Sequence, residues 1–278
     1  MRILLVIYGE LEQRTGGYRY DAKLVEHLKS RGHTVEVLSQ RGGSFPRRLL
    51  EDRPRSMVKL LRRLDVDLLL EDELNFASLL RSNRGVRREL ALPVISIVHH
   101  LSTSEEHGWI SGFLIKLLEK RFLQGLDGAI YNTNATRESV ERMSGGLLKG
   151  VVAPPSTEKA SQRTAAPGSS GMPGGGDAPR ENGKGVRLLT VASLIKRKRI
   201  DALIEAVALL EDEAVTLTIV GSGDAEPRTA RRLRALVKRY GLTDQVTFAG
   251  ELDESSLEEA YGEHDLFVLA SQYEGFGM

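Results

Sequence analysis

The sequence has no cysteine, a single tryptophan, and aromatic residues at only 5% of its 278 positions. The absence of cysteine excludes disulfide bonds, thiolate metal sites, iron–sulfur clusters and a cysteine nucleophile. No apolar run approaches the roughly 18 residues that cross a bilayer. The opening apolar stretch, residues 3–7, is too short for the core of a signal peptide. These absences favour a cytoplasmic protein and leave peripheral contact with the inner face of the membrane open.

The sequence also lacks an excess of charge of either sign. Lysine and arginine number 39, and aspartate and glutamate number 38, so the net charge of +1 provides no overall attraction to nucleic acid or anionic lipid. We therefore expect no nucleic-acid partner. Hydrophobic residues make up 41% of the chain and charged residues 28%, which is typical of folded domains, and the length favours two of them.

Residues 154–185 stand out because they contain almost no apolar side chains. This stretch holds five of the nine prolines and seven glycines, and no Ile, Leu, Val, Phe, Trp or Tyr. Such a segment cannot bury enough apolar surface to offset the entropy lost on ordering. The sequence thus predicts a domain at 1–153, a flexible Gly/Pro linker at 154–185 and a second domain at 186–278.

Both predicted domains alternate short apolar runs with amphipathic segments. In the first we expect strands at 3–7, 33–38, 67–70, 93–98, 127–131 and 150–153, and helices at 20–31, 47–64, 74–90, 105–124 and 134–143. In the second we expect strands at 186–192, 215–220, 246–249 and 266–269, and helices at 199–210, 227–240 and 255–263. Near-continuous Val/Ile/Leu strands separated by helices indicate parallel sheets covered on both faces. The predicted fold class is α/β, with two doubly wound Rossmann-like domains whose ligands bind in the crevice at the carboxyl ends of the strands.

Two motifs of the first domain follow predicted strands. Gly16 and Gly17 precede the first helix, where glycine lets a ligand approach the backbone and free amides attract an anion, although an ordinary turn is the alternative. His99 and His100 follow the strand at 93–98, where a neutral imidazole can hydrogen-bond a substrate hydroxyl. Alternation along a strand sends these two side chains opposite ways, and we expect His99 to face the crevice. A structural turn is the alternative.

Two motifs of the second domain lie at the same kind of edge. The run Lys196-Arg197-Lys198-Arg199 separates a strand from a helix, and such cations can gather the phosphates of a nucleotide diphosphate. A solvated charge run is the alternative. Gly221 and Gly223 follow the strand at 215–220 and allow a close backbone approach.

The chain ends on a third motif of the second domain. Glu274 comes just past the last predicted strand and offers an acceptor for sugar hydroxyls. The amides of Gly275, Phe276 and Gly277 suit a phosphate.

These motifs resemble the C-terminal domain of retaining nucleotide-sugar glycosyltransferases of the GT-B fold, the large group called family 4 or group 1. The similar stretches are 191–206, 219–223, 246–250 and, most specifically, 271–278. In the first domain, Gly16-Gly17, the stretch 31–35 and Val98-His99 are similar to the family's opening half. The resemblance covers nearly all of the chain except the predicted linker.

The resemblance implies transfer of a sugar, with retention, from a nucleotide-diphosphate sugar to a sugar or lipid-linked acceptor, without a metal or other cofactor. Lys198 matches the family's lysine on the diphosphate, whereas its usual arginine partner falls at Ser193, so Arg197 or Arg199 would substitute. The resemblance assigns His99 and Glu274 to catalysis, and Gly16 and Gly17 to the loop facing acceptor and phosphate. The residues expected to bind the donor are Ser193, Arg197, Lys198, Gly221, Gly223, Gly275, Phe276 and Gly277.

The family signature has two glutamates separated by seven residues. Glu274 matches the first, and the second would lie four positions beyond Met278. We therefore expect the 278-residue chain to stop inside the second domain and to catalyse no sugar transfer by itself. The alternatives are a non-catalytic module that binds a nucleotide sugar or carbohydrate, and a GT-B nucleotide-sugar epimerase.

Two stretches bear on the acceptor. Residues 47–63 hold seven Lys or Arg against two acidic residues. Apolar residues recur at helical spacing farther along, at Trp109, Ile110, Phe113, Leu114, Leu117 and Leu118. Docking on an anionic lipid surface that carries the acceptor is one interpretation. Core packing with a solvated outer face is the other.

Overall fold

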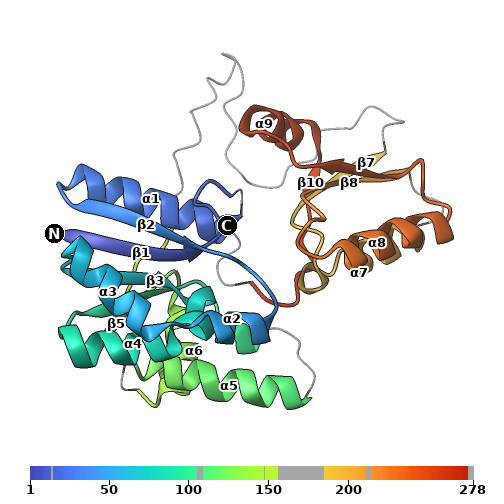
Figure 1. Ribbon diagram of the computed structural model, residues 1–278. Coiled ribbons are helices and arrows are strands. Elements are labelled where there is room, and N and C mark those ends of the chain that lie inside the picture. Colours follow the sequence, from blue (N-terminus) through green and yellow to red (C-terminus); the bar gives the residue numbers. More distant parts are fainter. Residues whose placement is uncertain (14, 105–108, 147, 156–184, 211–213, 275–278) are drawn as a thin grey trace. The chain divides into compact units, whose positions relative to one another are not determined.

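The computed structural model describes residues 1–13, 15–104, 109–146, 148–155, 185–210 and 214–274. The described chain divides into two compact units: residues 1–155 together with Glu274, and residues 185–273. Each is built on one sheet of parallel strands (Figure 1). Most of the predicted linker, residues 156–184, lies outside the described residues.

The first unit contains a six-stranded sheet in the order β2-β1-β3-β4-β5-β6. Its strands are β1 (Arg2–Tyr8), β2 (Thr34–Gln40), β3 (Leu68–Asp72), β4 (Val94–Val98), β5 (Gly128–Tyr131) and β6 (Gly150–Val152). Its helices are α1 (Gly16–Ser30), α2 (Phe45–Glu51), α3 (Pro54–Leu64), α4 (Phe76–Leu90), α5 (Trp109–Leu123) and α6 (Asn134–Ser144), with short 3-10 turns η1 (Glu73–Asn75) and η2 (Ser102–Ser104).

The second unit contains a four-stranded sheet in the order β10-β7-β8-β9. Its strands are β7 (Val186–Val191), β8 (Val215–Val220), β9 (Val246–Gly250) and β10 (Leu266–Phe267). Its helices are α7 (Ile200–Ala208), α8 (Pro227–Arg239) and α9 (Glu254–Glu263), with the 3-10 turn η3 (Lys196–Lys198).

Side chains from both faces of each sheet are buried, which confirms the predicted α/β class. In the first unit Leu4 and Val6 pack with α3 to α6, whereas Leu5 and Ile7 pack with α1 on the other face. In the second unit α7 and α8 cover one face, and α9 covers the other through Ala260. Each predicted strand is present with ends that differ by at most two residues from the expected ones.

One predicted helix is wrong. The stretch 47–64 forms two helices, α2 and α3, instead of one. Asp52 leaves the helical conformation and turns its carboxylate inward, where it accepts hydrogen bonds from the amides of Arg81 at 2.5 Å and Ser82 at 3.0 Å. Pro54 also disfavours a helical conformation at the residue before it. A second difference is that α1 begins at Gly16 rather than at residue 20, so Gly16 and Gly17 form its first turn.

Gly221 controls how closely the loops after β7 and β8 approach. Its φ is 145°, and a Cβ at this position would lie 2.1 Å from the carbonyl oxygen of Ala192. The amide of Leu194 donates to the carbonyl of Ser222 at 2.8 Å, and the amide of Gly221 donates to the carbonyl of Gly250 at 2.7 Å. The carboxyl ends of three strands are therefore linked through a position that only glycine fits.

We expect Gly221→Ala to lower the free energy of unfolding by about 2–4 kcal/mol, because it forces both a strained backbone and a steric clash. Gly262→Ala is the matched control, since a Cβ at this helical position meets nothing within 4 Å. Urea unfolding followed by circular dichroism measures both. Equal midpoints for Gly221→Ala and the wild type would contradict this account of the loop.

Candidate functional site

The second unit brings several predicted donor-binding residues to one edge of its sheet. Ser193 follows β7, and Gly221 and Gly223 follow β8. The hydrogen bond between Leu194 and Ser222 joins these two loops. Gly223 is packed against α8, because a Cβ there would lie 2.7 Å from the Cβ of Ala230. Close packing therefore requires glycine at positions 221 and 223, in addition to the predicted role of both residues in binding the donor.

Two residues of the basic run 196–199 make contacts within the second unit. The guanidinium of Arg197 donates to the carbonyl of Tyr273 at 2.5 Å, and the carbonyl of Arg197 accepts from the amide of Gln272 at 2.9 Å. Arg199 has a left-handed backbone, and its Nε lies 3.2 Å from a carboxylate oxygen of Asp201. Lys198 closes the turn η3 just before α7 begins. Of the two proposed substitutes for the missing arginine, Arg199 is therefore engaged with Asp201, and Arg197 with the backbone of Gln272 and Tyr273.

The predicted residues near the end of the chain are described only in part. Glu274 is half-buried and directly follows Tyr273. Gly275, Phe276 and Gly277 lie outside the described residues.

The first unit places its two predicted motifs in contact. A Cβ on Gly17 would lie 3.3 Å from Cδ2 of His99, so the first turn of α1 packs directly on the imidazole at the end of β4. The ring of Tyr20 meets that of His99 edge to face, with centroids 5.2 Å apart. The fold thereby brings Gly17 into contact with His99, although the two residues are 82 positions apart in sequence.

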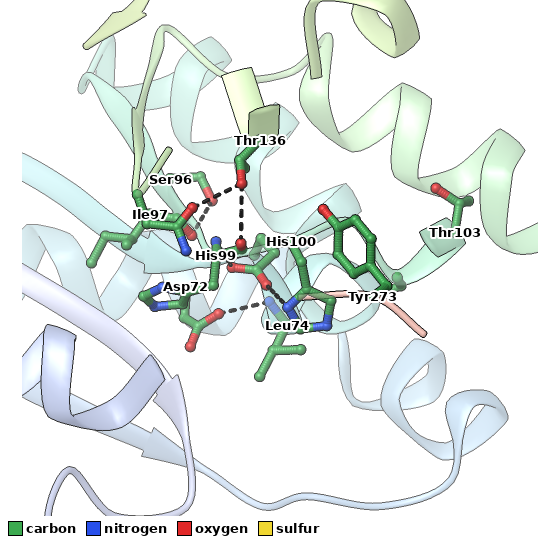
Figure 2. A network of polar contacts seen from close by, with 12 residues as sticks. Asp72, Leu74, Ser96, Ile97, His99, His100, Thr103, Thr136 and Tyr273 are labelled. Atoms are coloured by element: carbon green, nitrogen blue, oxygen red, sulfur yellow. Dashed lines mark hydrogen bonds and ion pairs between the residues drawn. The ribbon is translucent and has the colours of Figure 1, made fainter. Parts of the chain in front are cut away.

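Three buried acids surround His99, and together these four residues form what we call the acid–histidine cluster: Asp21, Asp72, Glu73 and His99. Nε2 of His99 lies 3.1 Å from Oδ1 of Asp21, and the amide of His99 donates to Glu73 at 3.0 Å. Each member is at most 5% exposed. Figure 2 shows the end of β4 with Asp72, whose carboxylate accepts from the amide of Leu74 at 2.9 Å.

Burial sets the charges of this cluster. It raises the pKa of Asp21 to about 8 and that of Asp72 to about 6. Burial also raises the pKa of Glu73 and lowers the pKa of His99. Near neutral pH, Asp21 is therefore protonated, Asp72 carries a negative charge and the imidazole is neutral.

The same atoms have the donor types of a metal site. One atom each from Asp21, Asp72 and His99 lies within 4.8 Å of the others. Two carboxylates and an imidazole suit a divalent ion such as Zn²⁺ or Mn²⁺. The contact between His99 and Asp21 fits a hydrogen bond without a metal equally well, and the prediction that no metal takes part stays a prediction.

His100 has different surroundings from His99. Its side chain is 19% exposed, and its Nδ1 lies 3.8 Å from a carboxylate oxygen of Glu73. The carbonyl of His99 accepts from the hydroxyl of Thr136 at 3.3 Å, as Figure 2 shows. The imidazole of His99 thus points towards α1 and β3 inside the unit, and which histidine faces a substrate stays a prediction.

Sequence reasoning missed all three acids of the cluster. A signal was present for two of them, because Asp72 and Glu73 follow an apolar strand, as His99 does. The carboxyl ends of neighbouring parallel strands meet at one edge, so these residues were candidates for the same site.

We expect Asp21→Asn to flatten the dependence of stability on pH. The folded state holds a proton on Asp21 up to a pKa of about 8, whereas the unfolded chain releases it near 3.8. The stability that this proton contributes is complete below pH 4 and is lost as the pH rises towards 8. Asparagine keeps the neutral shape and does not titrate.

Between pH 6.5 and 9 the wild type should lose on the order of 2 kcal/mol more than Asp21→Asn. Urea unfolding at both pH values measures this difference. Asp65→Asn, which changes an exposed carboxylate of the same unit, serves as control. Parallel losses in the wild type and Asp21→Asn would show that Asp21 is already ionised in the folded protein.

Comparison with known proteins adds the family context. Residues 177–278 match the family described as Glycosyl transferases group 1. The mannosylfructose-phosphate synthase of Agrobacterium fabrum is 37% identical over 101 residues, which is 34% of this chain and 22% of that protein. The serotype-specific mannosyltransferase WbdA of Escherichia coli is 36% identical over 93 residues, or 33% of this chain and 11% of that protein. The matched part thus spans less than a quarter of these relatives.

Solved structures share the fold of the whole chain. The sucrose-phosphate synthase of Thermosynechococcus elongatus has a TM-score of 0.75 at 19% identity, covering 100% of this chain and 77% of that one. Anabaena HepE in complex with UDP and glucose has a TM-score of 0.65 at 18% identity, covering 100% and 76%. The chain therefore has the GT-B fold of these structures, and its last 102 residues carry the match to the glycosyl transferases of group 1.

Proposed function

We propose that this protein is a retaining glycosyltransferase, which moves a sugar from a nucleotide-diphosphate sugar to a hydroxyl of a sugar or lipid-linked acceptor. The observation that carries the proposal is the group 1 match over 177–278, the part of the chain with the linked loops after β7 and β8. In the reaction the bond from the anomeric carbon to the diphosphate breaks, and a bond to the acceptor oxygen forms. The products are the glycoside, the nucleotide diphosphate and the proton of the acceptor hydroxyl.

In the second unit, Lys198 is the residue that we assign to the diphosphate of the donor. It lies between the end of β7 and the start of α7, where backbone amides also favour an anion. A cation here stabilises the charge that develops on the leaving diphosphate. Ser193, Gly221 and Gly223 form the adjoining loops that would border the donor.

In the first unit, Gly16 and Gly17 would face the acceptor and phosphate, and His99 the sugar. Support comes from the contact between Gly17 and His99. Burial holds the imidazole neutral, and Asp21 is then a positioning residue, because its Oδ1 lies 3.1 Å from Nε2 of His99 and fixes the orientation of the ring. Glu274 keeps its assignment as a catalytic carboxylate near the donor sugar.

The proposal predicts release of a nucleotide diphosphate that depends on an acceptor. A panel of UDP-, GDP- and ADP-sugars with sugar and lipid acceptors measures this release with the protein that the complete natural gene encodes, and proton NMR of the product determines its anomeric configuration. Of the two histidines, His99→Ala should lose turnover at least tenfold more than His100→Ala, with folding of both checked by circular dichroism. A product of inverted configuration would contradict retention, and a loss confined to His100→Ala would reverse the assignment.

Lys198→Ala should weaken binding of UDP or GDP, because it removes a charge-assisted contact worth roughly 1.5–3 kcal/mol, or about 10–150-fold in Kd. Calorimetric titration with each nucleotide, using the protein that the complete natural gene encodes, measures the affinity. Lys238→Ala, which removes an exposed lysine of α8, is the matched control. If both variants bind like the wild type, Lys198 does not contact the diphosphate.

A further inference from the structure

Helix α5 of the first unit exposes part of the apolar stripe that its sequence contains. Ile115 and Phe122 lie in the core, and the ring of Phe122 is 6.3 Å from that of Phe76 in α4. By contrast, Phe113 is 71% exposed, Leu114 45% and Leu117 36%. Core packing therefore explains only the inner side of the helix, and three large apolar side chains face outward.

The charges on the same outer side are all positive. Lys116, Lys120 and Arg121 are exposed, and with the three apolar residues they occupy an arc of about 160° at 3.6 residues per turn. The acidic residue of α5, Glu119, is buried and accepts from the amides of Ser102 at 2.6 Å and Thr103 at 3.2 Å. Burial raises the pKa of Glu119. No acidic side chain of α5 therefore opposes the outward cations.

This outer side has the composition of a helix that lies on a membrane. Large apolar side chains beside lysine and arginine bind where headgroups meet acyl chains, and anionic lipid adds electrostatic attraction. The surface is preformed, because the inner side of α5 packs in the core and Glu119 ties the helix to η2. None of the described helices is long and apolar enough to cross a bilayer.

We propose that the outer side of α5 binds the surface of an anionic lipid bilayer. Phe113, Leu114 and Leu117 enter the interface, and Lys116, Lys120 and Arg121 contact the headgroups. Figure 1 shows α5 at the lower edge of the first unit. This inference goes beyond sugar transfer and does not require it, since bilayer binding can be measured without any substrate.

The test uses vesicles of phosphatidylglycerol mixed with phosphatidylcholine, compared with pure phosphatidylcholine. Co-sedimentation measures the partition coefficient. One variant removes apolar contact, Phe113→Ser with Leu117→Ser, and another reverses charge, Lys116→Glu with Lys120→Glu.

A control is needed because α8 also exposes cations. It carries six Lys or Arg and no acid over Pro227–Arg239. Arg231→Glu with Arg232→Glu reverses two exposed charges there without touching α5. All of the altered side chains are exposed, so none of the variants should unfold the protein.

The wild type should bind the anionic vesicles, and it should bind pure phosphatidylcholine vesicles at least tenfold less well. Each α5 variant should weaken the partition at least tenfold, by loss of apolar contact or of attraction to the headgroups. The α8 variant should stay within about threefold of the wild type, since α8 takes no part in the proposed surface and attraction to the headgroups falls off within a Debye length. Absence of binding to the anionic vesicles overturns the proposal.

Two further outcomes would also overturn it. If only the α8 variant loses binding, attraction acts through the second unit and not through α5. If light scattering without lipid shows a dimer that the Phe113→Ser, Leu117→Ser variant dissociates, the apolar surface is covered by a second copy of the chain.

Discussion

Parallel pairing of the strands is the constraint on which both units depend. In the first unit β1 pairs in parallel with β2 and β3, and β4 continues the sheet from β3. This register places Asp72, at the end of β3, opposite Ile97, two residues before His99. In the second unit the parallel pairing of β7 with β8 sets Val191 opposite Val220, so the loops that follow begin side by side. Backbone hydrogen bonds between parallel strands thus bring each set of candidate residues to one edge of its sheet.

Much of this arrangement could be predicted from the sequence. Near-continuous Val, Ile and Leu runs identified the strands, and their positions placed Gly17 and His99 at the same edge. The position of Asp21 could not be predicted in this way, because Asp21 lies within a helix and does not follow a strand. In the predicted helix, which begins at residue 20, Asp21 lies in the first turn. In the structure α1 begins at Gly16, and the side chain of Asp21 contacts the imidazole of His99.

Two other features depend on tertiary contacts that local patterns do not encode. The break at Asp52 follows from a carboxylate that satisfies amides of α4, about thirty residues away in sequence. On α5, apolar residues occur at both inner and outer positions, so periodicity alone could not decide which side is buried. Contact with Phe76 and the inward turn of Glu119 decide it.

The acid–histidine cluster also has a kinetic consequence. The carboxyl of Asp21 has no exposed surface, and the imidazole that it contacts is packed under Gly17 and Tyr20. A proton can reach or leave such a site only when α1 opens locally, and openings of this kind are far rarer than collisions with water. The rate at which Asp21 ionises thus depends on local opening of α1. After a change of pH, the protonation of Asp21 would equilibrate more slowly than that of the surface carboxylates.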